Sequence, residues 1–323
     1  MLRFCAKRLV SMVFVLFSIS VLSFLIFFAT PGVDPAARIA GRNADQLTLQ
    51  AVRKDFGLDK PIFVRYAIMM KKLFITRDLT SYVNRGEKVI PQVTQAAPVT
   101  LSLVLGAAVI WVVFSIGMGL LAAVFRGKPI DTAVMILGLI GISMPVFWLG
   151  EVVNLLTQSR FHHSFLFSWV PALGYTPFTQ SPFGWFKSLV FPWLTLSILY
   201  IGIYARVLRS ALVEAQEEDY VRTARAKGLT ERRVLIRHAL RTSLIAFVSL
   251  FGLDFGALVG GGALLTEVVF GLHGVGKLTF DSLQNFDLPV ILATVIYAAF
   301  FVVLANALVD LVYALLDPRV RRA

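Results

Sequence analysis

Residues 99–125, VTLSLVLGAAVIWVVFSIGMGLLAAVF, contain no charged side chain. The stretch exceeds the roughly 20 apolar residues that a helix needs to cross a hydrocarbon core about 30 Å thick. The whole chain agrees, because 57% of its 323 residues are hydrophobic, 15% are charged, and the mean hydropathy is +0.77. This composition predicts a membrane protein and excludes disorder, and the single Cys5 excludes an intramolecular disulfide.

Five further stretches approach the same length, so the sequence predicts an all-α, polytopic protein with six transmembrane helices. The six spans are residues 9–33, 99–125 within the uncharged run 89–125, 132–150, 188–205, 242–266 and 288–309, the last continuing toward 316. The third span has Met144-Pro145 as an expected kink and could continue past Glu151. The first could instead be a cleaved signal peptide, but its apolar run exceeds the usual 7 to 15 residues and no A-x-A site follows.

Basic residues in the short loops predict the orientation. Arg126 and Lys128 lie in one such loop, nine Lys and Arg lie in 206–241, and three Arg lie in the tail. These segments are expected in the cytosol together with both termini. The net charge of +12 therefore indicates contact with anionic membrane lipid rather than with nucleic acid.

The segment after the first span is too polar to cross the membrane and too patterned for a linker. Residues 46–56 predict a helix that Gly57 ends, and Asp59-Lys-Pro61 opens a second one with an apolar side. We expect a helical extracytoplasmic insertion that handles a partner or substrate, with a packing spacer as the alternative.

The predicted organisation is thus a tail and first helix (1–33), the insertion (34–97), a five-helix core (98–316) that carries a cytoplasmic loop (206–241), and a cytoplasmic tail (317–323).

The cytoplasmic loop is the most informative segment. Its pattern predicts a helix over 210–227, a break at Gly228, and a second helix with Thr230 as N-cap. A DNA-binding helix-turn-helix is excluded because the loop is joined closely to a membrane span at each end. A solvated charge run remains the alternative, although it does not explain the small residues Ala224 and Gly228, which would let another protein's backbone approach.

The loop sequences DYVRTARAKG (219–228) and RHALR (237–241) resemble the "EAA" segment of bacterial ABC importer permeases. The similarity is to the first permease of the dipeptide/oligopeptide/nickel group and extends over almost the whole chain. Further matching motifs are TPG (30–32), GLDKP (57–61), SMPVFWLG (143–150), TEVVFG (266–271) and LLDPR (315–319). The sequence departs from the family at Ala246, where Pro is common, and at Asp254, where Gln is frequent.

This resemblance implies a permease subunit of the cell inner membrane that imports peptides and is not itself an enzyme. It also implies a second homologous permease, two cytoplasmic ATPase domains that bind ATP and Mg, and an extracytoplasmic substrate-binding protein; the chain itself needs no cofactor. A nickel complex, glutathione or haem remain alternative cargoes, and a secondary carrier or channel without an ATPase, or a non-transporting scaffold, are alternative functions. The residues implied to couple to the ATPase are Tyr220, Val221, Arg222, Thr223, Ala224, Arg225, Ala226, Lys227 and Gly228.

Charges at membrane depth are costly unless they are paired or hydrated, so they indicate functional positions. Asp254, Glu151 and Glu267 are therefore candidate pathway residues, although Asp254 could instead be a hydrogen-bonded packing group and Glu151 an interfacial one. Gly252, Gly256 and Gly260 form a small-residue stripe around Asp254 that predicts close helix packing.

Two other patterns do not predict sites. GLHGVGKL (271–278) nearly matches the phosphate-binding pattern G-x-x-x-x-G-K-[ST], but Leu278 stands where the hydroxyl side chain is required. The adjacent His162 and His163 are expected to be solvated on an external loop, so no metal site is predicted.

Overall fold

The computed structural model describes residues 2–28, 36, 46–55, 57–84, 86–158 and 161–316. Within these ranges the regular structure is helical, and one isolated β-bridge joins Thr80 to Lys88. Several predicted features lie partly or wholly outside the described residues: the end of the first span (29–33), parts of the insertion 34–97, the TPG and LLDPR motifs, and the tail 317–323.

Five helical runs in the described part of the chain are long and apolar enough to cross a membrane. They are α1 (Leu2–Phe28), α5 (Val89–Val124), α8 (Pro182–Glu217), a compound run over Glu231–Gly262, and α14 (Leu288–Leu316). The compound run consists of α10 (Glu231–Val234), the π-helical η2 (Leu235–Ala239), α11 (Leu240–Ala257) and the π-helical η3 (Leu258–Gly262).

The predicted third span is not one straight helix. It is divided into α6 (Pro129–Ser143) and α7 (Val146–Gln158), which meet at an angle of 91°. Met144 is extended, with φ −89° and ψ 121°, because a residue before proline is disfavoured in helical conformation. The described part of the chain thus has five helical runs that could cross a membrane, or six if this bent pair counts as one span.

Two spans begin earlier than their apolar cores predict. α5 starts at Val89 and includes Pro98, because Val89 and Ala96 are buried by tertiary packing. α8 starts at Pro182, where the Ser181 hydroxyl accepts a hydrogen bond from the Gly184 amide at 3.0 Å.

α8 is also longer than a bilayer requires. Its 36 residues extend about 54 Å at 1.5 Å per residue, well over the roughly 30 Å of the hydrocarbon core. Glu217 and the loop that follows it lie beyond the apolar stretch of this helix, which ends near residue 205.

The main hydrophobic core lies between α5, α8 and α11. Trp111, Tyr204 and Leu208 are fully buried there. α6 approaches α8 closely where Gly138 meets Gly202, since a Cβ on Gly202 would lie 2.3 Å from the Gly138 carbonyl oxygen. A side chain larger than hydrogen would separate these helices.

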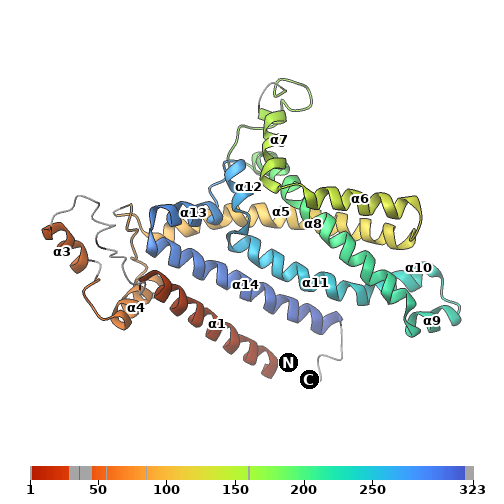
Figure 1. Cartoon of the computed structure of the whole chain (residues 1–323), viewed down its shortest axis with the longest axis horizontal. Coiled ribbons are helices and arrows are strands. Elements are labelled where there is room, and N and C mark those ends of the chain that lie inside the picture. Colours follow the sequence, from red (N-terminus) through yellow and green to blue (C-terminus); the bar gives the residue numbers. More distant parts are fainter. Residues whose placement is uncertain are drawn as a thin grey trace.

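The two ends of the molecule carry different elements (Figure 1). The short helices α9 (Asp219–Ala226) and α10 lie at one end, and the start of α1 and the end of α14 point toward that side. α3 (Gln46–Asp55), α4 (Ile62–Met70) and α13 (Val275–Asn285) lie at the other. Gly57 follows α3 with φ +63°, as its predicted role in ending that helix requires.

The segment 57–88 is fixed to the spans rather than loosely attached. The Asp287 carboxylate accepts hydrogen bonds from the Ser81 hydroxyl and, at 3.0 Å, from the Tyr82 amide. Tyr66 shares a 2.7 Å hydrogen bond with Ser20 of α1. A second hydrophobic cluster joins this segment to α1 and α14 through Phe24, Met69, Leu73, Tyr82 and Ile291.

Candidate functional site

The loop 218–234 forms a small helical hairpin at the end of α8, which we call the α9–α10 hairpin. Glu218 is extended, with φ −71° and ψ 148°, so the predicted continuous helix over 210–227 was wrong. The chain turns there and begins α9 with Asp219 in its first turn, where a negative charge is favourable to the helix dipole.

Gly228 ends α9 with φ +78°. The Leu229 amide donates to the Ala224 carbonyl at 3.4 Å, and the Gly228 amide donates to the Arg225 carbonyl at 2.9 Å. This pair of bonds is a Schellman motif, which needs a residue in the left-handed conformation. The predicted break at Gly228 is therefore present and has a backbone cause.

The hairpin has its own hydrophobic core. Val221, Ala224 and Val234 are buried, and Leu229 packs against them. The prediction that Ala224 offers itself to another protein is contradicted, because its side chain closes the hairpin internally. Thr230 has the extended backbone of an N-cap, but its hydroxyl makes no capping hydrogen bond to α10.

The outer face of α9 is formed by other residues. Tyr220, Arg222, Thr223, Ala226 and Lys227 are all exposed. Tyr220, Thr223 and Lys227 follow helical spacing, so they line one side of α9. We call Tyr220, Thr223, Ala226 and Lys227 the α9 outer face.

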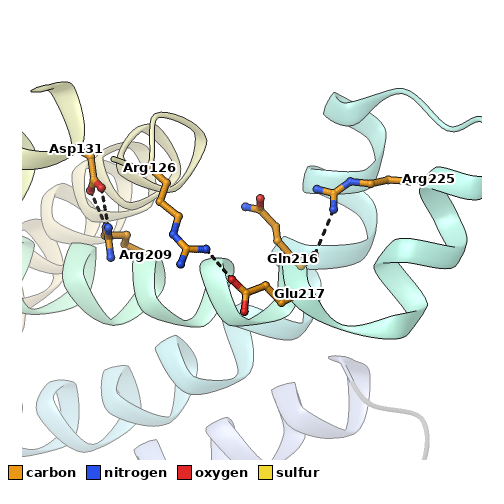
Figure 2. A network of polar contacts seen from close by, with 6 residues as sticks. All are labelled: Arg126, Asp131, Arg209, Gln216, Glu217 and Arg225. Carbon is orange, nitrogen blue, oxygen red and sulfur yellow. Dashed lines mark hydrogen bonds and ion pairs between the residues drawn. The ribbon is translucent and has the colours of Figure 1, made fainter. Parts of the chain in front are cut away.

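Arg225 fixes the hairpin to the rest of the protein. Its guanidinium bonds both Glu231 carboxylate oxygens, at 2.9 and 3.3 Å, and the Gln216 carbonyl of α8 at 3.3 Å. One side chain therefore ties α9 to both α8 and α10; Figure 2 shows the contact with Gln216 of α8.

The last turns of α8 are also tied to the α5–α6 loop and to the first turn of α6 (Figure 2). Arg209 bonds the Asp131 carboxylate through two nitrogens at 2.6 Å each, and Arg126 bonds Glu217 at 2.7 Å. Asp131 also accepts from the Gly127 amide at 3.0 Å. The Asp131–Arg209 pair is the buried one, since the Asp131 side chain is only 7% exposed whereas that of Glu217 is 64% exposed.

This link was missed in the sequence. Asp131 and Arg209 are 78 residues apart in the sequence. Each lies next to the end of an apolar stretch, where a charged residue is common. Only the packing of α6 against α8 brings the two side chains together.

Asp254 lies on α11 and is partly buried. It accepts a 2.7 Å hydrogen bond from the hydroxyl of Tyr204, which is itself fully buried. Beside this pair, Trp111 stacks on Tyr200 and contacts Phe251, with ring centres 4.7 and 5.6 Å apart. The Trp111 indole nitrogen is buried without a hydrogen-bond partner in the described part of the chain.

The three glycines around Asp254 lie against α14. A Cβ on Gly252 would be 2.0 Å from Val309, one on Gly256 would be 2.9 Å from Val302, and one on Gly260 would be 3.0 Å from Ala298. The stripe allows α11 and η3 to approach α14 closely.

Glu267 has a structural role that the sequence did not indicate. It lies on α12 (Leu264–Val269), fully buried, and accepts from the Thr100 hydroxyl at 2.6 Å and the Lys277 amide at 2.9 Å. In this conformation the Glu267 side chain has no exposed surface, and its role in the pathway stays a prediction. The same contacts occupy the first turn of α13 in the 271–278 motif, where a phosphate would have to bind.

The other sequence candidates lie apart from these groups. Glu151 is exposed on α7, and the rings of His162 and His163 contact each other edge-on with centres 5.6 Å apart. Across the described ranges, no group of three or more His, Cys, Asp or Glu is arranged to hold a metal ion.

Comparison with known proteins places this chain in a family. Residues 115–322 match the family described as binding-protein-dependent transport system inner membrane component, and residues 1–104 match the N-terminal region of such components. A protein of Brucella abortus (strain 2308) named as a peptide transport system permease is 38% identical over 315 residues, which are 98% of each chain. The glutathione transport system permease of Escherichia coli O6:H1 is 35% identical over 321 residues, 99% of each chain, and a D,D-dipeptide transport system permease of E. coli K12 is 34% identical over 331 residues, 98% of this chain and 96% of the relative. The chain therefore belongs to the inner-membrane permease components of binding-protein-dependent transport systems.

Proposed function

We propose that this chain is one of two permease subunits of an ATP-driven peptide importer. The observation that carries the proposal is the α9–α10 hairpin, a preformed two-helix unit held outside the membrane by the long α8. Its position matches the segment that, by family resemblance, contacts the ATPase. The names of the Brucella and E. coli relatives support peptide cargo.

The proposed assembly contains a second homologous permease, two ATPase domains and a substrate-binding protein. The basic loops support a cytosolic position for the hairpin and both termini, where the ATPase domains would bind ATP and Mg. The segment 46–88 then lies outside, where the binding protein delivers its cargo. The hairpin and the α3–α4 segment lie at opposite ends of the molecule, which supports this orientation (Figure 1).

The α9 outer face is the proposed contact with the ATPase. Its exposed positions combine an aromatic ring at Tyr220 with the small side chains of Thr223 and Ala226, which suits insertion into a groove. Exposed ion pairs from Arg222 and Lys227 would add little, so we assign most of the docking to shape.

The route from the ATPase to the spans follows the polar links at the base of the hairpin. Arg225 joins α9 to the last turn of α8, and Asp131–Arg209 joins α8 to α6. A displacement of α9 would therefore move α8 and α6 together. We propose this rigid connection as the coupling path to the bent α6–α7 pair.

Asp254 is the proposed pathway residue. The partly buried carboxylate and the neighbouring aromatic rings could bind the ammonium group of a peptide, through charge and the ring faces. The unpartnered Trp111 indole N–H beside them could donate to a peptide carbonyl. Asp254 is preferred over Glu151 and Glu267 because it is the one of the three that is neither fully buried nor remote from the helix core.

Glutathione is a second candidate cargo, because the E. coli O6:H1 relative of comparable identity is a glutathione permease. Glutathione also carries an ammonium group, so the same Asp254 environment would serve it. Uptake of labelled dipeptide, longer peptide and glutathione by cells with and without the chain separates the two cargoes.

Disulfide or bifunctional cross-linking tests the docking directly. With Cys5→Ser as background, Ala226→Cys should cross-link to a separate ATPase subunit, whereas Ala224→Cys, buried in the hairpin, should not. Uptake should also stop when that ATPase is deleted. Uptake that continues without any ATPase would instead establish a secondary carrier, and no flux with all subunits present would establish a scaffold.

A further inference from the structure

A basic groove lies just beyond the hairpin, on α10, η2 and the start of α11. Its volume is about 540 Å³, and it is lined by Thr230, Arg232, Arg233, Ile236, Arg237 and Arg241. Four of these six residues are arginines, so the groove is strongly positive. We call it the arginine groove.

The arginines are arranged in a row along the helix. Arg233, Arg237 and Arg241 follow each other at intervals of four residues, which places them near one side of the compound helix. Ile236 lies among them with 51% of its surface exposed. The groove therefore offers several guanidinium groups beside one apolar contact.

Three nearby arginines outside the groove have acidic partners, whereas Arg232, Arg233 and Arg237 of the groove have none among the described residues. Arg209, Arg222 and Arg225 are paired with Asp131, Asp219 and Glu231. Within the described ranges, no ion pair involves Arg232, Arg233 or Arg237. Like charges collected in this way repel each other, and an anion from outside the chain would relieve that repulsion.

The depth of the groove indicates which anion. The apolar part of this span begins at Thr242, directly after Arg241. At about 1.5 Å per residue, Arg237 lies roughly 8 Å from that boundary, and the headgroup layer is roughly 5 to 8 Å thick on each side. Arg237 and Arg241 are thus at the level of lipid phosphates, whereas Arg233 lies roughly 14 Å from the boundary, on the aqueous side of that layer.

We propose that the arginine groove binds the phosphate headgroup of an anionic phospholipid. Guanidinium groups match phosphate oxygens in pairs, and Ile236 would contact the lipid's glycerol or upper acyl carbons. This proposal depends on the proposed function in one respect: the cytosolic position of the hairpin decides which leaflet supplies the lipid. The bound lipid would anchor the helix that leads directly from the α9–α10 hairpin into the membrane.

Lipid retention tests the proposal without requiring transport. The full-length chain, with its partner subunits, is placed in nanodiscs of phosphatidylcholine alone or phosphatidylcholine mixed with phosphatidylglycerol, and retained lipids are counted by native mass spectrometry. We expect phosphatidylglycerol to be retained by the unaltered chain. The variant R233Q/R237Q/R241Q should bind it roughly a hundredfold more weakly.

Matched controls separate a site from general charge. K60Q/K71Q/K88Q removes three positive charges from exposed positions of the segment at the other end and should retain the lipid. R233K/R237K/R241K keeps the positive charge and should retain most of the lipid. Loss of the lipid in both variants would indicate a folding defect at these positions. Coupled ATP hydrolysis is measured separately, so loss of coupling with lipid retained would count against the proposed function alone.

Three outcomes would overturn the proposal. Equal retention by the Gln variant would show that the groove is not the lipid site. Protection of the groove arginines from phenylglyoxal by added inorganic phosphate, but not by phosphatidylglycerol, would show a site for free anions. Protection that requires the ATPase subunit in phosphatidylcholine alone would assign the groove to an acidic protein surface.

Discussion

Gly228 shows how one backbone conformation determines the hairpin. Its φ is +78°, and a Cβ there would meet no atom within 4 Å, so any cost of a side chain comes from the backbone alone. We expect Gly228→Ala to weaken the hairpin by about 1 kcal/mol and the β-branched Gly228→Val by more. Cargo-stimulated ATP hydrolysis should fall in that order, at equal complex abundance.

Gly127 provides the matched control for this prediction. It has φ +76° and equally open space, but lies in the α5–α6 loop. Gly127→Ala should carry a similar strain and leave hairpin proteolysis unchanged. If Gly228→Val keeps normal ATP hydrolysis, the hairpin does not transmit the ATPase motion.

Asp254 can be tested by separating its charge from its hydrogen bond. Asp254→Asn removes the charge, whereas Tyr204→Phe removes only the hydroxyl that donates to it at 2.7 Å. If the carboxylate binds a cargo ammonium, Asp254→Asn should lower uptake of peptides with a free amino terminus by roughly tenfold relative to acetylated ones. Competition uptake assays measure the ratio.

Tyr204→Phe should leave that ratio nearly unchanged, because the carboxylate remains. If both substitutions instead reduce the amount of assembled complex without altering the preference, Asp254 has a packing role.

At the scale of elements, the α9 outer face and the hairpin core predict different defects. Ala226→Glu places a charge on the exposed face and should weaken ATPase docking by roughly tenfold without unfolding the hairpin. Ala224→Glu places a charge in the hairpin core and should unfold it. Limited proteolysis distinguishes the two, and co-purification of the ATPase measures docking.

Ser210→Glu, exposed on α8, is the control for added charge near the cytosolic end. It should leave docking intact. Normal docking of the Ala226→Glu variant would remove the α9 outer face from the contact.

The connection between α6 and α8 predicts a second result at this scale. Asp131 and Arg209 form a bidentate pair with the Asp131 side chain 7% exposed. A double-mutant cycle with Asp131→Asn and Arg209→Gln should give a coupling of about 1 to 2 kcal/mol in thermal unfolding. The same cycle on the exposed Arg126–Glu217 pair should give less. Equal values would mean that the buried pair does not link the two helices rigidly.

At the scale of the whole molecule, the position of the segment 46–88 at the end opposite the hairpin predicts its role. Its contacts with Asp287, α1 and α14 show that it is part of the packed structure, so a deletion must spare residues 57–88. Replacing 46–56 by a short Gly-Ser linker removes α3 alone. We expect assembled complexes with severalfold lower uptake if the segment receives the binding protein, as proposed.

Asp287→Ala is the companion variant, since it frees the 81–82 turn from α14 while keeping every helix. It should reduce uptake less than the α3 replacement if contact with the binding protein matters more than rigidity. Unchanged uptake in the α3 replacement would identify a spacer, and binding-protein affinity measured on the same complexes checks the reason.

The sequence by itself determined the membrane class, most of the spans, the helix ends at Gly57 and Gly228, and the family. These follow from local quantities: uncharged length against bilayer thickness, and residues whose backbone preferences act over a few positions. The sequence predicted α5 and α8 to be shorter than they are, because their polar ends are stabilised by distant contacts rather than by their own hydrophobicity.

Only the tertiary structure decided what the polar side chains do. Ala224 is internal because α9 folds against α10, Glu267 is buried because α12 meets α5 and α13, and the Asp131–Arg209 pair exists because α6 packs on α8. The 91° bend after Ser143 likewise exceeds what a single proline specifies. The physical reason is common to all of these: the sequence gives the cost of burying a charge or a small residue, but the partner that offsets that cost comes from a remote part of the chain.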